Sequence, residues 1–145
     1  MKQPLFIKWH RANEVGIPLL DEQHRGIVSI INTFFHLMRS GIHNQLLYSC
    51  ISEAMRNYTR IHFLTEESFL AEAGFEGLEK HKEIHQQLSL DIERMEQKSI
   101  RDNDPAPLLD FLKMWWMEHI NVEDRQYSEC LIEYFRPHYH PHRNR

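Results

Sequence analysis

The chain has 145 residues, 41% of them hydrophobic and 26% charged, with a net charge of −4, two cysteines and eleven histidines. This length fits one domain with a single core, the cysteines are too few for a disulfide framework, and the mixed charges offer no basic face for nucleic acid. The opening residues MKQPLFIKWH lack the apolar run of a signal peptide, and no stretch is apolar enough to span a membrane. We therefore expect a cytoplasmic protein without nucleic-acid or membrane partners.

Proline and glycine divide the chain into an arm, four helices and a tail. Residues 1–18 contain two prolines and a tryptophan, which predicts an extended N-terminal arm that packs on the rest of the protein through Trp9. No proline occurs between Pro18 and Pro105, and Gly41 and Gly74 interrupt that stretch. This punctuation predicts three long helices, with a fourth after the segment DNDPAP. Residues 136–145 are polar and rich in histidine and arginine, which predicts a mobile tail.

Each predicted helix has one apolar face with the i, i+3, i+4, i+7 spacing of an amphipathic helix. The first helix is expected to have Asp21 as its N-cap and to stop at Gly41. The second begins near Asn44, and the fourth opens near Asp104-Pro105. Short connections between four such helices predict an all-α, up-down-up-down four-helix bundle over residues 19–135.

The inward faces of all four helices include histidine, where apolar residues are expected. His62 and Glu66 are four residues apart, as are His81 and His85, so each pair stands on one face of its helix. A buried imidazole or carboxylate without a partner costs several kcal/mol. One inward histidine is more often an ordinary core residue than a ligand, but four helices that each direct histidine inward predict a metal site.

The number and type of these residues indicate which metal the site would hold. Five inward histidines together with carboxylates exceed the three or four protein ligands of a zinc ion, and residues 81–85 read HKEIH rather than HExxH. Imidazole with carboxylate suits iron, and two ions bridged by carboxylates would use the whole set. No glutamate has a histidine three residues later, so the Glu-x-x-His pairs of ferritin-like sites are absent. The sequence predicts a histidine-rich centre.

A set of residues spread over 6–135 carries a family resemblance. They are Trp9, Gly16-Ile17, Asp21-Glu22-Gln23-His24, His62-Phe63, Glu66-Glu67, His81, His85, Trp115, His119-Ile120, Asp124 and Tyr127. With these residues the chain resembles the hemerythrin family, and specifically the single-domain bacterial hemerythrins (bacteriohemerythrins). The resemblance covers nearly the whole chain, and every ligand position of the family pattern is filled.

The resemblance implies two iron ions with a bridging oxo or hydroxo group and no haem. The implied ligands are His81, His85 and His119 for one ion, His24 and His62 for the other, and Glu66 and Asp124 as bridges. Three histidines and the bridging atoms fill one ion's coordination shell, whereas two histidines leave an open position on the other. This arrangement implies reversible O2 binding without catalysis, for oxygen carriage, storage or sensing.

One bridging ligand is not the residue that helical spacing favours. Glu123 is four residues after His119 and would lie nearly beneath it, whereas Asp124 would lie about 140° around the helix. The family pattern favours Asp124, which implies either an approach from the helix flank or a local irregularity after Ile120. Tyr127 is expected either to donate a hydrogen bond to Asp124 or to lie at the bundle end with its hydroxyl in water.

Aromatic residues near the implied ligands are candidates for a dry O2 pocket. Phe63, Phe111 and Trp115 lie within eight residues of a ligand histidine, although ordinary core packing would also account for them. The remaining histidines are expected to lie at the surface or in the tail and not to bind the metal. These are His10, His36, His43, His138, His140 and His142.

Two other functions are compatible with the same ligands. The site would also suit a di-iron oxidase or peroxidase or a nitric-oxide-reducing enzyme, although the sequence contains no separate general acid, base or substrate channel. The chain would alternatively be a regulatory module that responds to iron or oxygen and acts on a signalling partner, although the bundle occupies nearly all of it. We expect a monomer with O2 as its ligand, and an oxygen-receiving or signalling partner is not identified by the sequence.

Overall fold

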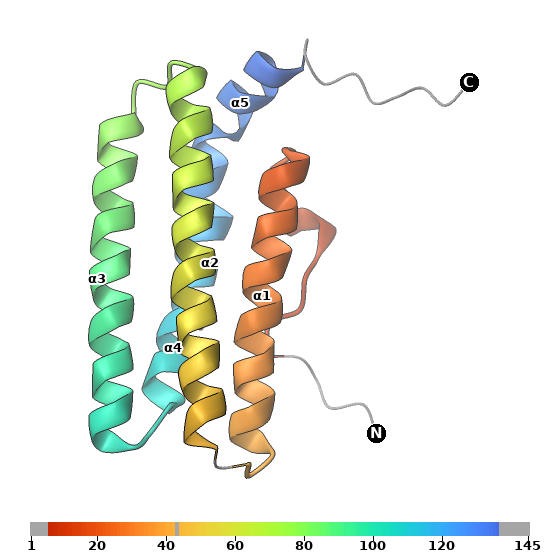
Figure 1. Cartoon of the computed structure of the whole chain (residues 1–145). Helices are drawn as coiled ribbons and strands as arrows, with labels where there is room; N and C mark the ends of the chain where they lie inside the picture. The colour runs from red at the N-terminus through yellow and green to blue at the C-terminus, as the bar shows by residue number, and fades with distance from the viewer. Residues whose placement is uncertain (1–5, 43, 137–145) are drawn as a thin grey trace.

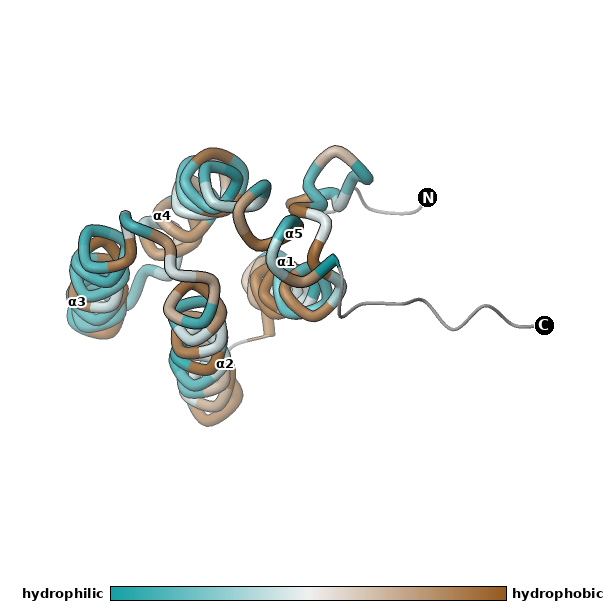
Figure 2. The backbone as a smooth tube through the Cα atoms, turned by 90° about the horizontal axis from the view of Figure 1, so that it is seen from above, coloured by the Kyte–Doolittle hydropathy of each residue, from teal (hydrophilic) through white to brown (hydrophobic). Residues whose placement is uncertain are grey.

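A computed structural model describes residues 6–42 and 44–136 and shows a four-helix bundle (Figure 1). Its first three helices are α1 (Pro18–Arg39), α2 (Gln45–Glu72) and α3 (Leu78–Asp102). Its fourth helical rod, which runs from residue 106 to residue 135, starts with α4 (Ala106–Trp115). Viewed from above, the helices of the bundle surround a common centre (Figure 2). The predicted all-α bundle is therefore confirmed. Among the described residues, no helix is both long enough and apolar enough to cross a membrane.

The fourth rod is not one regular helix. After α4 the chain forms a π-helix (Trp116–Glu123), a 3-10 turn (Asp124–Tyr127) and α5 (Ser128–Phe135). The irregularity that the sequence places after Ile120 thus begins earlier, at Trp116. The backbone N–H of Asp124 donates a hydrogen bond to the carbonyl of His119, five residues back. The wider π-helical turn therefore contains both residues.

One predicted helix start is correct and one predicted N-cap is wrong. As expected, α2 begins next to Asn44, whose side chain accepts a hydrogen bond from the backbone N–H of Leu47 at 3.0 Å and caps the helix. Asp21, in contrast, is not the N-cap of α1, because the helix begins at Pro18, whose fixed φ and missing N–H suit a first turn. The Asp21 carboxylate instead accepts hydrogen bonds from the backbone N–H groups of Val15, at 2.7 Å, and Gly16, at 3.2 Å.

The segment before α1 lies against the bundle. The backbone of Ile7 exchanges two hydrogen bonds with the side-chain amide of Asn32 on α1, both at 2.8 Å, and the Ile7 side chain is buried. Trp9 is partly buried, with its ring 5.6 Å from that of Trp116. Ile7 therefore anchors this segment alongside Trp9. Apart from Arg136, the tail expected to be mobile lies outside the described residues.

The apolar core consists of two clusters. The larger fills most of the bundle and includes Ile27 of α1 and Phe63 of α2. The smaller lies beyond it and includes Leu20 of α1 and Leu70 of α2, with Tyr127.

The inward histidines lie near the boundary of the two clusters. His24, His81 and His85 fall between their residues, whereas His62 and His119 each directly precede a residue of the larger cluster. A layer of polar side chains is thus enclosed by apolar packing on both sides.

The contact between α5 and the segment that precedes α1 can be tested at Gly16. Gly16 has φ of +89°, and a Cβ at this position would stand 2.9 Å from Cδ1 of Ile132. Gly41 has a similar φ of +73°, but a Cβ there would meet no atom within 4 Å. Both alanine substitutions incur the left-handed backbone cost of about 1 kcal/mol, and Gly16→Ala must also displace Ile132, for a total of roughly 2–3 kcal/mol.

We expect denaturant titrations, performed in one metal-loading state, to show a larger loss of unfolding free energy for Gly16→Ala than for Gly41→Ala. Equal losses in the two variants would contradict the packing of Gly16 against Ile132.

Candidate metal centre

The structure places all seven ligands implied by the sequence together in the polar layer. They are His24 from α1, His62 and Glu66 from α2, His81 and His85 from α3, and His119 and Asp124 from the irregular part of the fourth rod. All seven are buried, and none exposes more than 5% of its surface.

Glu66 lies between histidines of two helices. Its Oε2 is 3.2 Å from Nε2 of His62, four residues earlier on α2. Its Oε1 is 3.1 Å from Nε2 of His85 and also contacts Nε2 of His81, both on α3. The two oxygens of this carboxylate therefore face different helices.

Asp124 repeats this arrangement. Its Oδ2 is 3.2 Å from Nε2 of His24 and 3.7 Å from Nε2 of His62. Its Oδ1 is 3.1 Å from Nε2 of His119 and 3.7 Å from Nε2 of His81. Each carboxylate thus directs one oxygen to a two-histidine side, formed by His24 and His62. The other oxygen faces a three-histidine side, formed by His81, His85 and His119.

The π-helix explains why Asp124 takes this position and Glu123 does not. In a regular α-helix the residue four positions after His119 would lie beneath it. The wider turn brings the fifth residue there, so Asp124 is fully buried and Glu123 is partly exposed. Residue spacing alone favours the wrong carboxylate because it assumes regular helical geometry.

Two polar side chains outside the seven hold histidine rings in place. Nδ1 of His62 lies 3.0 Å from Oε1 of Gln23, and Nδ1 of His85 lies 2.8 Å from Oε1 of Glu67. These contacts orient the two rings with their Nε2 atoms inward. Sequence reasoning assigned no role to Gln23, although it directly precedes His24.

Tyr127 contacts a different carboxylate from the one expected. Its hydroxyl donates a hydrogen bond to Oε2 of Glu66 rather than to Asp124. The π-helix and the 3-10 turn shift Tyr127 around the rod toward α2, which accounts for the difference. Burial, together with the nearby charges of Asp124 and Glu66, raises the pKa of the Tyr127 hydroxyl well above its usual value. Tyr127 therefore remains a neutral hydrogen-bond donor.

Two of the three expected pocket residues contact the three-histidine side. The Phe63 ring stacks on His85 with centroids 3.9 Å apart, and Trp115 stacks near His119 at 6.3 Å. Both residues are buried. They shield the histidine rings from solvent.

Trp116, which sequence reasoning did not select, lies at the two-histidine side. Its ring stands perpendicular to that of His24 with centroids 6.2 Å apart, and it is buried. Phe111 packs against the larger apolar cluster, as a partly buried residue. Trp116 follows the buried Leu112 by four residues, and its backbone N–H still bonds to the Leu112 carbonyl, so its inward position follows the regular repeat of α4.

The carboxylates are charged although they are buried. Burial opposes ionisation of Glu66, but hydrogen bonds and charge from His62, His81 and His85 hold the pKa of its carboxyl well below the usual value. Burial likewise opposes charge on His62, but contacts with Asp124 and Glu66 raise its pKa to about 9. The imidazoles around each carboxylate therefore stabilise its charged form inside the bundle.

Several inward atoms lie within 3.2 Å of an imidazole or carboxylate atom but make no hydrogen bond of acceptable geometry among the described residues. They are Nε2 of His85, Nε2 of His119 and both carboxylate oxygens of Asp124. The ligand atoms form two groups in which all atoms lie within 4.8 Å of one another. One comprises Glu66, His81, His85, His119 and Asp124, and the other comprises His24, His62, Glu66 and Asp124.

The two carboxylates belong to both groups. A buried polar atom without a partner is costly, and a metal cation would satisfy these atoms. The donor set therefore fits a non-haem metal site.

Comparisons with known proteins agree with this geometry. The sequence model of the hemerythrin HHE cation binding domain matches residues 15–131. A bacteriohemerythrin of Clostridium acetobutylicum is 30% identical over 127 residues, covering 83% of this chain and 98% of that protein. A bacteriohemerythrin of Pseudomonas aeruginosa is 30% identical over 127 residues, covering 85% of this chain and 80% of that protein. A hemerythrin chain of Sipunculus nudus is 30% identical over 128 residues, covering 85% of this chain and 92% of that protein.

A solved structure shows the same fold. The crystal structure of a hemerythrin mutant matches with a TM-score of 0.75 at 22% identity, covering 88% of this chain and 98% of that one. The family model spans most of the chain and includes all seven residues of the polar layer. The chain belongs to the hemerythrin family.

Proposed function

We propose that this centre holds two iron ions, joined by a bridging oxo or hydroxo group, and binds O2 reversibly for carriage, storage or sensing. The observation that carries the proposal is the division of the carboxylate oxygens. Glu66 and Asp124 each direct one oxygen to the two-histidine side and the other to the three-histidine side. Two ions are able to share both carboxylates in this arrangement, and the imidazole and carboxylate donors suit iron.

The unequal number of histidines supports a binding position for O2. The side formed by His24 and His62 offers one ligand fewer than the opposite side. An ion held there has room for one more small ligand. When bound, the two irons supply a redox-active pair that exchanges electrons with O2.

Apolar packing supports reversible binding at this side. Trp116 faces His24, and Ile120 is completely buried in the larger apolar cluster. Such surroundings exclude water, and a dry, apolar site retains bound O2 without supplying protons. Phe63 and Trp115 provide the same shielding at the three-histidine side.

The polar contacts around the centre support preorganised ligands. Tyr127 donates to Glu66 and restrains that carboxylate, while Gln23 and Glu67 restrain the rings of His62 and His85. These contacts hold the ligand atoms in place before the metal or O2 binds.

The remaining buried acids favour binding over enzymatic turnover. Among the described residues, the buried carboxylates outside the metal centre are Asp21 and Glu96. Asp21 accepts backbone hydrogen bonds from Val15 and Gly16, and Glu96 lies near the opposite end of α3. Glu96 is therefore remote from the two-histidine side, and the carboxylate of Asp21, one turn before His24, is held by backbone donors.

Iron content and optical spectra test the proposal. We expect two iron ions per chain, and charge-transfer bands that appear with O2 and disappear on its removal over repeated cycles. His62→Ala removes a ligand of the two-histidine side and should abolish these reversible bands. His36→Ala, a change outside the metal centre, is the control and should retain them.

A purified protein that stays folded but takes up no iron would contradict the proposal, as would reversible O2 binding by His62→Ala. Rapid irreversible oxidation by O2 would favour an enzyme or a sensor over a carrier.

A second pair of substitutions tests the role of the π-helix. Asp124→Ala removes an oxygen donor from both ligand groups, so we expect it to bind fewer than two iron ions per chain. Glu123→Ala changes the adjacent, partly exposed carboxylate and should keep both ions. Metal analysis of the purified variants by mass spectrometry measures the difference. Loss of iron in Glu123→Ala with full loading of Asp124→Ala would show that the regular helical spacing applies.

A further inference from the structure

A cavity of about 320 Å³ lies at the end of the bundle opposite the metal centre. It is enclosed by the last turns of α1 and α3 and the first turns of α2 and α4. Buried residues, Phe34, Glu96 and Leu108, line its inner part, while Gln45 and Ile100 are exposed at its outer part. The cavity therefore extends from the core to the surface, and its volume lies in the range of small-molecule sites.

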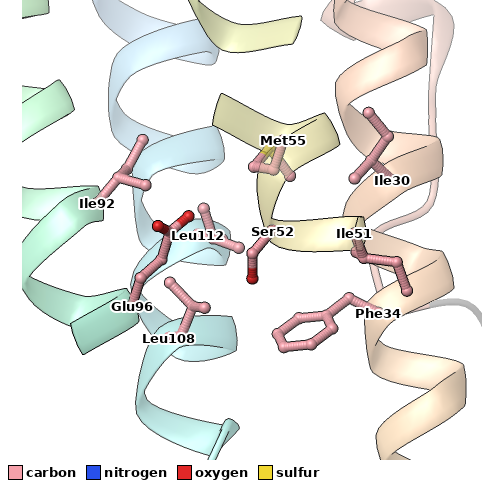
Figure 3. A pocket seen from close by; sticks show the side chains of 9 residues that line it. All are labelled: Ile30, Phe34, Ile51, Ser52, Met55, Ile92, Glu96, Leu108 and Leu112. Atoms are coloured by element: carbon pink, nitrogen blue, oxygen red, sulfur yellow. The ribbon is translucent and has the colours of Figure 1, made fainter. Parts of the chain in front are cut away.

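A smaller void of about 10 Å³ adjoins this cavity and shares four lining residues with it. Figure 3 shows the Glu96 carboxylate of α3 beside Leu112, and the Ser52 hydroxyl of α2 directed toward the space between Leu108 and Phe34. A buried carboxylate and a hydroxyl thus line this part of the bundle among apolar side chains.

Glu96 is only partly compensated by its partner. Nε of Arg56 lies 3.4 Å from Oε2 of Glu96, and the Arg56 side chain is 54% exposed, compared with 8% for Glu96. Burial raises the pKa of the Glu96 carboxyl in spite of the Arg56 charge. One exposed guanidinium therefore does not offset the lost hydration, and a second positive donor would stabilise the ionised carboxylate.

The other polar groups of the cavity also favour a cationic donor. The carboxylates of Glu93, Glu96 and Asp104 line it, against the single guanidinium of Arg56. Oγ of Ser99, another lining residue, is buried and has no hydrogen-bond partner among the described residues. The cavity thus combines apolar walls with an excess of acceptors and negative charge.

We propose that this cavity binds a small organic cation, a protonated amine on an aromatic or branched aliphatic body, with its ammonium group at Glu96 and its body between Phe34 and Leu108. The site is separate from the metal centre, because Glu96 follows His85 on α3 by eleven residues, or roughly 16 Å of helix. The proposal is independent of O2 binding.

Calorimetric titration of the full, iron-loaded chain with three probes of similar shape tests this proposal. The probes are 2-phenylethylammonium, neutral 2-phenylethanol and anionic phenylacetate. We expect saturable binding of the ammonium ion at least roughly tenfold tighter than that of the alcohol, with phenylacetate the weakest.

Four variants locate the site. Glu96→Gln should reduce the preference for the ammonium ion over the alcohol to within about twofold, and Arg56→Gln should tighten binding of the ammonium ion because it removes a competing cation. Leu108→Trp fills the cavity and should abolish binding of both probes. Glu53→Gln, an exposed change on α2 outside the cavity, is the matched control and should bind as the unmodified chain does.

Circular dichroism establishes that each variant is folded. If Leu108→Trp does not fold, the opposite changes expected for Glu96→Gln and Arg56→Gln still decide the question. The proposal is overturned if no probe binds saturably, if phenylacetate is preferred, or if Glu96→Gln leaves the preference for the ammonium ion unchanged. Binding of the ammonium ion that persists in folded Leu108→Trp would place the ligand elsewhere, including at the iron, and would equally overturn it.

Discussion

The burial of two carboxylates among five imidazoles is the constraint on which the rest of the structure depends. Ions removed from water destabilise a folded protein by several kcal/mol unless they are paired or bound to a metal. Here the carboxylates of Glu66 and Asp124 are completely buried and face only histidine and tyrosine side chains. Apolar clusters lie on either side of this layer. Because metal binding would relieve the cost of burial, the same side chains link metal binding to the stability of the fold.

The π-helix is the backbone feature that makes this layer possible. A regular α-helix would not direct both His119 and Asp124 to the bundle centre, whereas the wider turns do so through a hydrogen bond spanning five residues. The same change brings Tyr127 to Glu66. Such irregular turns often occur at functional sites, and here one departure from α-helical geometry accounts for the positions of both Asp124 and Tyr127.

Side-chain periodicity was sufficient to predict four helices and the inward direction of the histidines, because the helical repeat determines which residues share a face. It was not sufficient to choose Asp124 over Glu123, which required the family resemblance. The contact of Tyr127 with Glu66 depends on the altered helix phase, so no regular pattern could predict it. Asp21 was misassigned because its carboxylate reaches back to the preceding segment, a contact that spacing within the helix does not reveal.

The two ends of the bundle present different chemistry, with a dry histidine and carboxylate layer at one end and an open acidic cavity at the other. The central claim is that the layer holds two iron ions that share Glu66 and Asp124. Crystals of the iron-loaded protein, measured on both sides of the iron absorption edge, test this claim most directly. We expect two anomalous peaks, one beside His24 and His62 and one beside the three-histidine side, each in contact with both carboxylates. A single peak, or two peaks that share no carboxylate, would contradict this account.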